Sequence, residues 1–453
     1  MNKRLKYAIL TLALVQIFII MGLLAIPPIA QTLPGEFRVR LARLPLGEKL
    51  LDVGVTPLPT VLPAPSGAVA QSQIIIPTIT TKTPAPEIIA TVPAARSKIA
   101  SAIEKAATEP PPVPTVTAIP TAIATPMPLP EQARIEGMKI IAQGFNNCGP
   151  ANLTINLEFH GNDTTQAEAA AFLKPNREDR NVSPWQMVDY VNEQTDMHAF
   201  VGSGGDLELL KRLIASGFPV VIEKGYELPR EGWLGHYLTL FGYDDTAQEM
   251  VSLDTNLGPW DGSGRYDSYE DIERYWQQFN RTFFVVYPPE KEQLVFAILG
   301  AEMLDKAAMW QQAAQQAQVD IDADPQNAYA WFNLGTSLTR LGELTGEAGF
   351  YENGAAAFDQ AFILGVPPRI VWYQFRPYIA YLKVGRYQEM VDLADTVLKT
   401  QGGRNVEETY LYKGHALAFQ GDGVGAVEAY EQALSLNENF YPAQWALDSI
   451  TGS

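Results

Sequence analysis

Cysteine and histidine are scarce in this chain, whose 453 residues include one cysteine and four histidines. A single cysteine cannot form an intramolecular disulfide, and it cannot supply the several thiolates of a structural zinc site. The sequence also lacks a glycine-rich phosphate-binding loop, a dinucleotide-binding fingerprint and any paired metal-ligand spacing. The sequence therefore predicts a protein with no cofactor and no bound metal.

Basic residues are outnumbered by acidic ones. The chain has 33 lysines and arginines against 51 aspartates and glutamates, which gives a formal net charge of −18. Such a charge disfavours nucleic acids and anionic lipid surfaces as partners and favours basic or neutral ones. We therefore expect no nucleic acid partner.

The one cysteine stands in a turn that leads into a predicted helix. It belongs to the stretch Gln143-Gly-Phe-Asn-Asn-Cys148-Gly149-Pro150-Ala151, and apolar residues then follow with helical spacing. Proline suits the first turn of a helix. A thiol at a helix N-terminus meets free backbone N–H groups and the positive end of the helix dipole, and both favour the thiolate. The alternative is that Cys148 is a small buried apolar residue.

A cysteine nucleophile needs an imidazole that can take and return its proton. His160, His198 and His415 have sequence surroundings that favour structural roles. His236 lies in a predicted strand that turns near residue 245 and returns over residues 249–254. A hairpin centred there places Asp254 opposite His236, and a slip of one pair places Asn256 there instead. We predict that Asp254 orients the imidazole.

Taken together, Gln143-x4-Cys148-Gly-Pro-Ala, the later Gly-His236-Tyr and the following Asp254 resemble the papain-like cysteine peptidases of family 39. That family includes the leader-peptide-cleaving domains of bacteriocin exporters. The resemblance covers residues 131–290 and implies a role for each matching residue. Gln143 would donate to the oxyanion, Cys148 would be the nucleophile, His236 the general base and acid, and Asp254 the orienting carboxylate.

The order of predicted elements in residues 131–290 fits an α+β papain-like domain, because helices come first and antiparallel strands follow. Helices are expected over residues 165–173, from 183 onward, over 206–214 and over 269–279, and strands over 218–222 and 282–287. Trp233 could shield the His236–Asp254 pair from water. Tyr226 or Trp260 could line a substrate groove.

The N-terminal part of the sequence predicts a membrane anchor. Residues 1–6 are basic and residues 7–26 carry no charge, which is long enough to span a bilayer. A basic flank stays in the cytoplasm, so everything after the anchor is expected to be extracytoplasmic. Residues 27–130 are rich in Pro, Thr and Ala and are expected to form an extended linker without a core.

Residues 291–453 have a wholly helical pattern with an internal period. Gly342, Gly385 and Gly421 lie 43 and 36 residues apart, and a seven-residue insertion over 343–349 would reduce the first interval to 36. Small and aromatic residues at matched offsets make these units resemble tetratricopeptide repeats, which stack as helical hairpins. The repeats are expected to dock a peptide or protein partner, or else to be purely structural. No helix that would cap the array is evident after the third unit.

These observations predict a membrane-anchored, extracytoplasmic cysteine peptidase that acts on a peptide or protein substrate. Two other functions remain open. One is a catalytically silent protein that binds peptides, and the other is an amidase or acyl transferase that uses the same three residues. Both peptide hydrolysis and other acyl transfers pass through an acyl-thiol, so the sequence does not separate them.

Overall fold

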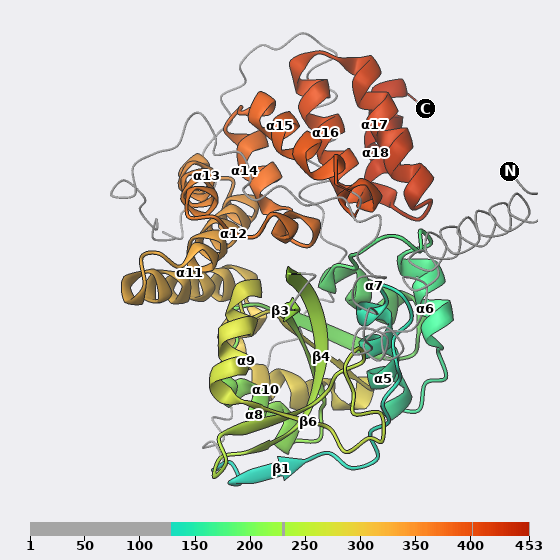
Figure 1. Cartoon of the computed structure of the whole chain (residues 1–453), viewed down its shortest axis with the longest axis vertical. Helices are drawn as coiled ribbons and strands as arrows, with labels where there is room; N and C mark the ends of the chain where they lie inside the picture. The colour runs from blue at the N-terminus through green and yellow to red at the C-terminus, as the bar shows by residue number, and fades with distance from the viewer. Residues whose placement is uncertain (1–127, 229–231, 401, 453) are drawn as a thin grey trace, which may run out of the picture.

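The computed structural model describes residues 128–228, 232–400 and 402–452. They form an α+β region built on one antiparallel sheet, followed by a region made of helices (Figure 1). The predicted membrane span at 7–26 and nearly all of the predicted linker at 27–130 lie outside the described residues. Within the described part of the chain, no helix has the length and apolar character needed to cross a membrane.

The sheet has seven strands, in the order β2-β7-β3-β4-β5-β6, and β1 pairs with the far end of β4. The strands are β1 (Gln132–Arg134), β2 (His198–Gly202), β3 (Val220–Leu228), β4 (Gly232–Asp244), β5 (Glu249–Leu253), β6 (Arg265–Ser268) and β7 (Phe283–Tyr287). All pairs are antiparallel. The long strand β4 is central because it pairs with β1, β3 and β5.

Helices cover both faces of the sheet. One face carries α5 (Cys148–Phe159), α6 (Gln166–Leu173) and α7 (Pro184–Gln194), and the other carries α8 (Leu207–Ala215), α9 (Tyr269–Trp276) and α10 (Glu292–Leu304). Alternate residues of β3 and β4 enter the two cores: Val221 and Tyr237 pack towards α5 and α7, whereas Ile222 and Leu238 pack towards α8. Helix α10 follows residue 291, the predicted boundary, but it belongs to the core of the sheet.

The helix starts follow local capping signals. Thr165 and Glu168 form a capping box on α6, Ser183 precedes Pro184 at the start of α7, and Asp206 caps α8. These starts agree with the helices expected from the sequence.

The predicted register of the β4–β5 hairpin was wrong. The hairpin closes at Asp244 and Glu249, and a bulge between Leu240 and Gly242 shifts the pairing, so that Thr239 lies opposite Leu253. Strand β5 ends there, and Asp254 is the first residue after it. The turn is thus centred between residues 246 and 247 and not at residue 245, and this difference, not the bulge, moves Asp254 away from the position opposite His236.

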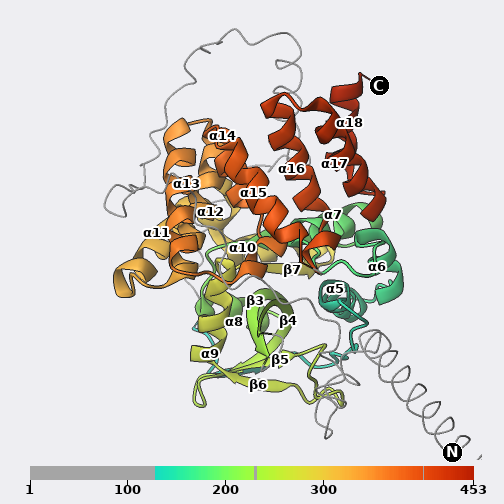
Figure 2. The same ribbon diagram turned by 45° about the horizontal axis from the view of Figure 1, so that its top comes forward.

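The C-terminal region consists of helices packed as successive antiparallel hairpins (Figure 2). They are α11 (Lys306–Ala323), α12 (Ala328–Thr345), α13 (Ala348–Ile363), α14 (Arg376–Lys383), α15 (Tyr387–Leu398), α16 (Glu407–Gln420), α17 (Gly423–Leu436) and α18 (Tyr441–Thr451). Residues 343–349 mostly extend α12 and α13 instead of forming a separate loop. The expectation that no helix caps the array was wrong, because α18 packs Ala443 and Ala446 into the last core cluster.

The two regions share a core and several polar contacts. Trp233 and Phe279 of the α+β region belong to the same buried cluster as α12–α16. Arg281 makes a two-pronged ion pair with Asp320 of α11, with N–O distances of 2.8 and 3.1 Å. In Figures 1 and 2 the helical region lies against one end of the sheet. The helices are therefore part of the folded unit and not a tethered module.

Candidate active site

Cys148 is the first residue of α5, and the loop before it is held by one glutamine. The side chain of Gln166 accepts the backbone N–H of Gly144 at 2.7 Å and donates to the carbonyl of Ala142 at 3.1 Å. It also accepts from the Asn147 amide at 3.2 Å. Cys148 itself is half-buried. The turn that presents the thiol is therefore fixed from the neighbouring helix α6.

Asn152 connects the start of α5 to the strand that carries His236. This residue is fully buried, and its Nδ2 donates to the carbonyls of Cys148 and Tyr237, both at 2.9 Å. Its Oδ1 accepts from the Thr239 hydroxyl at 2.8 Å. A fully satisfied buried amide of this kind fixes the relative position of two elements.

His236 lies on β4 and contacts Asp254 directly after β5. The His236 Nε2 to Asp254 Oδ1 distance is 3.2 Å, and the two residues are 4% and 2% exposed. The same Oδ1 accepts the backbone N–H groups of Asn256 and Leu257, each at 2.9 Å. Because Nε2 faces Asp254, Nδ1 is the ring nitrogen left for the hydrogen bond with Cys148.

The charges of these three groups support one another. Burial alone would lower the pKa of His236, but the charge and hydrogen bond of Asp254, together with Cys148, raise it to about 9. Burial would raise the pKa of the Cys148 thiol, but His236 and the backbone groups of Tyr237 and Gly149 lower it below its ordinary value. A low thiol pKa beside a high imidazole pKa favours a thiolate–imidazolium pair near neutral pH.

Gln143 lies in the loop before Cys148 and is 8% exposed. Its side-chain oxygen accepts from the Thr255 hydroxyl at 2.8 Å, and its backbone N–H donates to the Thr255 carbonyl at 2.9 Å. Since the oxygen end is held by Thr255, the NH₂ end is the one that can donate to a ligand. Thr255 directly follows Asp254. The same short segment therefore carries Asp254 and holds Gln143.

The ring that covers His236 belongs to Tyr226 and not to Trp233. Tyr226 of β3 stacks on the imidazole with ring centroids 4.9 Å apart and planes inclined by 27°. Trp233 instead stacks on Phe279 at 5.6 Å, inside the core shared with the helices. The predicted shielding role of Trp233 was wrong, because its ring packs in the shared core and not on His236.

The other three histidines have structural partners. His160 bonds the carbonyl of Val286 at 2.9 Å, His198 pairs with Glu292 at 2.8 Å, and His415 bonds the Tyr430 hydroxyl at 2.9 Å. None of these pairs includes Cys148.

Sequence reasoning missed several residues that build the site, among them Asn152, Gln166, Thr255 and the stacking role of Tyr226. An asparagine four residues after Cys148, one turn along the helix that the cysteine begins, was a usable signal. The other three act through contacts between segments that are distant in the sequence. Within the described ranges, no cluster of three His, Cys, Asp or Glu side chains could hold a metal ion.

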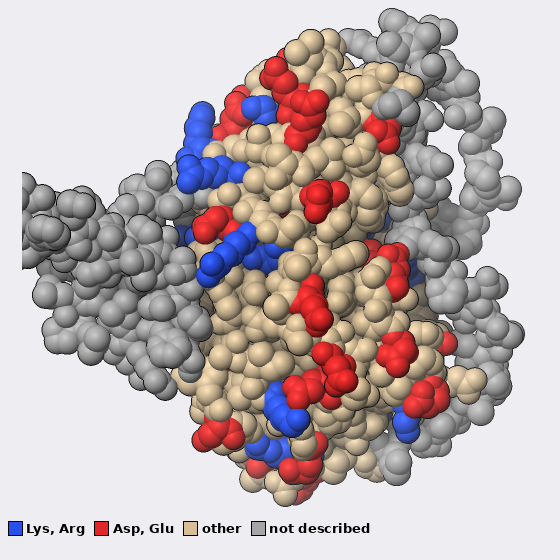
Figure 3. All heavy atoms as spheres, turned by 90° about the vertical axis from the view of Figure 1, so that its right-hand side faces the viewer, with Lys and Arg blue, Asp and Glu red and all other residues tan. Residues whose placement is uncertain are grey.

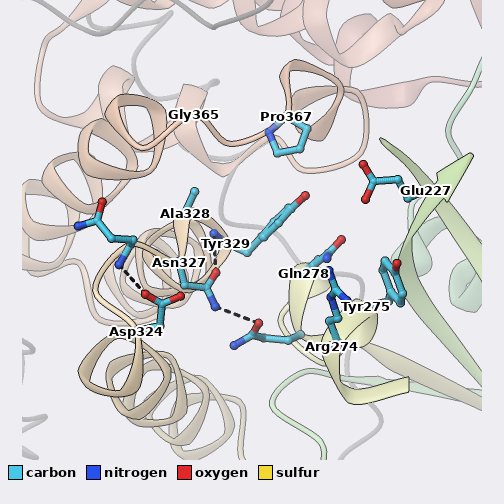
Figure 4. Close-up of a pocket in the computed structure, with 12 residues that line it drawn as sticks. Glu227, Arg274, Tyr275, Gln278, Asp324, Asn327, Ala328, Tyr329, Gly365 and Pro367 are labelled. Atoms are coloured by element: carbon cyan, nitrogen blue, oxygen red, sulfur yellow. Dashed lines mark hydrogen bonds between the residues drawn. The ribbon is translucent and has the colours of Figure 1, made fainter. Parts of the chain in front are cut away.

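A separate polar cavity of about 380 Å³ lies between the two regions (Figure 4). Glu227, Arg274 and Tyr329 are among its lining residues, and Trp233 donates to a further one, Gln278, at 2.6 Å. No cysteine, serine or histidine lines the cavity. We therefore assign no chemistry to it.

The surface is consistent with the acidic composition. On the face shown in Figure 3, acidic side chains are spread over the molecule with basic ones among them. No continuous basic patch, of the kind that tracks a nucleic acid backbone, is visible on this face.

Residues 128–283 match the sequence model of a family described as Peptidase C39 like. The match covers less than half of the chain, and it includes Gln143, Cys148, His236 and Asp254. The crystal structure of a candidate C39-like peptidase from Bacillus anthracis is similar to part of this chain, with 16% sequence identity and a TM-score of 0.28. The aligned part is 34% of this chain and 96% of the Bacillus anthracis chain. At this TM-score the similarity carries no argument. No curated protein matches the chain. The α+β region is thus similar to a family of cysteine peptidases, and the helical region after it lies outside the match.

Proposed function

We propose that this protein is a cysteine peptidase that hydrolyses peptide bonds through Cys148, His236 and Asp254. The observation that carries the proposal is the chain of contacts from the half-buried thiol to the imidazole and on to a buried carboxylate 3.2 Å away. The family match over residues 128–283 supports the same class of reaction.

In the first half of the reaction, the Cys148 thiolate attacks the carbonyl carbon of the scissile peptide bond. The carbonyl oxygen becomes an oxyanion, and Gln143 Nε2 and the Cys148 backbone N–H donate to it. His236 then gives its proton to the leaving amine as the C–N bond breaks. The products of this half are a free amine and an acyl-thioester on Cys148.

In the second half, His236 takes a proton from a water molecule, which attacks the thioester carbonyl. The C–S bond breaks, the acid product leaves, and the thiolate–imidazolium pair is restored. Asp254 holds the imidazole in the required orientation and stabilises its charge throughout. Asn152 keeps the two elements that carry Cys148 and His236 together.

Two measurements test the proposal on the full chain. Because Cys148 is the only cysteine, iodoacetamide reports on it alone, and it should react on the order of tenfold faster than free cysteine near pH 6.5. Incubation with a peptide library should give cleaved products by mass spectrometry, and Cys148→Ala should abolish them. Rapid labelling with acyl transfer to added amines but no hydrolysis would instead support a transferase. Labelling no faster than free cysteine would favour a silent binding protein.

We also propose that residues 7–26 anchor the chain in a membrane, with the catalytic and helical regions extracytoplasmic. The uncharged span after a basic flank supports this topology. Protease added to intact cells should cut within residues 27–130 and release both regions together. A fully protected C-terminal tag would contradict the proposal.

The helical region is proposed to be an array of tetratricopeptide-like hairpins that holds part of a protein substrate. Close helix packing supports this, because a Cβ at Gly335 would lie 2.8 Å from the Phe358 ring. Deletion cannot test the role, since it would expose Trp233 and Phe279. The intact chain should instead show a lower KM for a protein substrate than for a short peptide with the same cleavage site. Equal KM values would favour a purely structural array.

A further inference from the structure

A side chain from the helical region reaches the candidate active site. Tyr373 follows the short helix η4 (Pro368–Trp372), and a Cβ on Gly235, the residue before His236, would lie 3.0 Å from its ring. Burial raises the pKa of Tyr373 to about 12, and Arg369, Cys148 and Arg180 all act on it electrostatically. Tyr373 therefore lies against the strand that carries His236.

The two arginines contact different segments near the site. Arg369 donates to the carbonyl of Trp233 at 3.3 Å, three residues before His236. Arg180 belongs to the loop between α6 and α7, and its guanidinium lies 5.6 Å above the ring of Phe145, three residues before Cys148. One arginine thus adjoins the strand of the base and the other adjoins the loop of the nucleophile.

Arg180 has no anionic partner among the residues that the structure describes. Its guanidinium makes no ion pair and no hydrogen bond there, and its Nε is buried without a partner. A half-buried guanidinium without a carboxylate is unusual, because burial of a charge is costly unless it is paired. The stacking on Phe145 holds the group in place without satisfying its donors.

Nearby acids are engaged elsewhere. Asp179 is buried and accepts the backbone N–H of Asn181 at 3.1 Å. Burial raises the pKa of Asp179 well above its usual value, and it raises those of Glu407 and Glu408 as well, while Lys174 lies beside Asp179 and Glu407. This cluster therefore has its own cation and carries little negative charge towards Arg180.

We propose that Arg180 is a specificity residue that binds a carboxylate of the substrate beside the scissile bond. Arginine presents paired N–H donors that fit a carboxylate, and Arg369, near the strand of His236, adds positive potential. Phe145 and Tyr373 form the apolar sides of this subsite. The inference rests on the proposed peptidase function and names its substrate class as peptides with an acidic side chain, or a free C-terminal carboxylate, near the cleaved bond.

Matched peptides test the inference on the full chain. Glu is placed at successive positions around a cleavable bond and compared with Gln at the same position, and a free C-terminus is compared with an amidated one. At one position the acid should raise kcat/KM by roughly tenfold or more, since hydrogen bonds to charged groups are strong. The comparison of internal Glu with the C-terminal acid identifies the source of the carboxylate.

Variants then assign the preference to a residue. Arg180→Gln should remove most of the preference for the Glu peptide over the Gln peptide. Arg180→Glu should instead favour a peptide with Lys at that position. Arg177→Gln, an exposed arginine in the same loop, should keep the wild-type ratio. A ratio that is unchanged in Arg180→Gln, or no preference in the wild type, would overturn the inference.

Binding keeps the test independent of turnover. With Cys148→Ala, fluorescence anisotropy of the same labelled peptides should show the acid peptide binding more tightly than its amide, and the added substitution Arg180→Gln should abolish that difference. Equal binding of acid and amide peptides would overturn the inference. Absence of cleavage together with slow iodoacetamide labelling would contradict the peptidase proposal, whereas the binding comparison would still decide the role of Arg180.

Discussion

Two buried histidines, one in each region, differ in what surrounds them. His236 and His415 are both 4% exposed. The pKa of His236 is raised to about 9, because Asp254 and Cys148 outweigh the effect of burial. The pKa of His415 is lowered to about 3 by burial, and its ring bonds only the neutral hydroxyl of Tyr430. Depth of burial alone therefore does not set the direction of a histidine pKa shift. The charge of the hydrogen-bond partner decides it.

A similar contrast separates one set of buried polar groups in the helical region from the candidate active site. In the helical region, Asp359 accepts hydrogen bonds from Tyr381 and Arg386, and this closed set joins neighbouring helices. In the α+β region the chain of contacts ends at a half-buried thiol that can meet a substrate. Polar groups that bond only one another stabilise a fold, whereas a series of contacts that ends at a half-buried thiol leaves that thiol free to react.

Replacing the charged partner of His236 should have the largest effect. In Asp254→Asn the imidazole loses both its charge stabilisation and its orientation, and kcat/KM should fall by roughly a thousandfold or more. Asn256→Ala is the control, because only the backbone of Asn256 bonds Asp254. A crippled Asn256→Ala with an active Asp254→Asn would show that the wrong partner has been assigned.

The pH dependence of activity should follow the raised pKa of His236. Because the imidazolium must supply a proton, kcat/KM should fall as the pH rises through about 9. The residual activity of Asp254→Asn should fall at a lower pH, since the carboxylate charge that raises the pKa of His236 is gone. If the two enzymes lose activity at the same pH, Asp254 does not set the pKa of the essential acid.

Two asparagines one helical turn apart separate stability from positioning. Asn152 and Asn156 are both fully buried on α5, and both bond Thr239. Each change to alanine should lower the free energy of unfolding by about 1–3 kcal/mol, because buried partners are left unsatisfied. Only Asn152→Ala should also slow labelling of Cys148 by iodoacetamide, since Asn152 alone bonds the Cys148 carbonyl. Equal labelling rates in the two variants would assign Asn152 a purely structural role.

His415→Phe should change stability without changing activity. In the wild type, unfolded His415 takes up a proton below about 6.5 while the folded residue stays neutral down to about 3. The free energy of unfolding should therefore fall as the pH drops from 6.5, and His415→Phe should remove part of that fall. Urea titrations at pH 7 and pH 5 measure the effect. Loss of peptidase activity in this variant would link the helical core to catalysis.

The sequence by itself determined what depends on neighbours along the chain. Helix starts at Thr165, Ser183 and Asp206 follow from side chains that cap the next few N–H groups. The turn before Cys148 and the helix after it follow from Gly149, Pro150 and apolar spacing in the same way. The contact of His236 with Asp254 was also predicted, although through a register that the structure corrects.

Only the tertiary structure decided which distant groups meet at the thiol. The bulge in β4, the choice of Tyr226 over Trp233 as the ring on His236, and the hold of Gln166 on the loop before Cys148 all depend on packing between separate segments. The place of Tyr373 and the unpaired state of Arg180 depend on how the helices lie against the sheet. Local propensity acts over a few residues, whereas such contacts arise when distant segments pack into a shared core. Patterns in a single sequence therefore do not predict them.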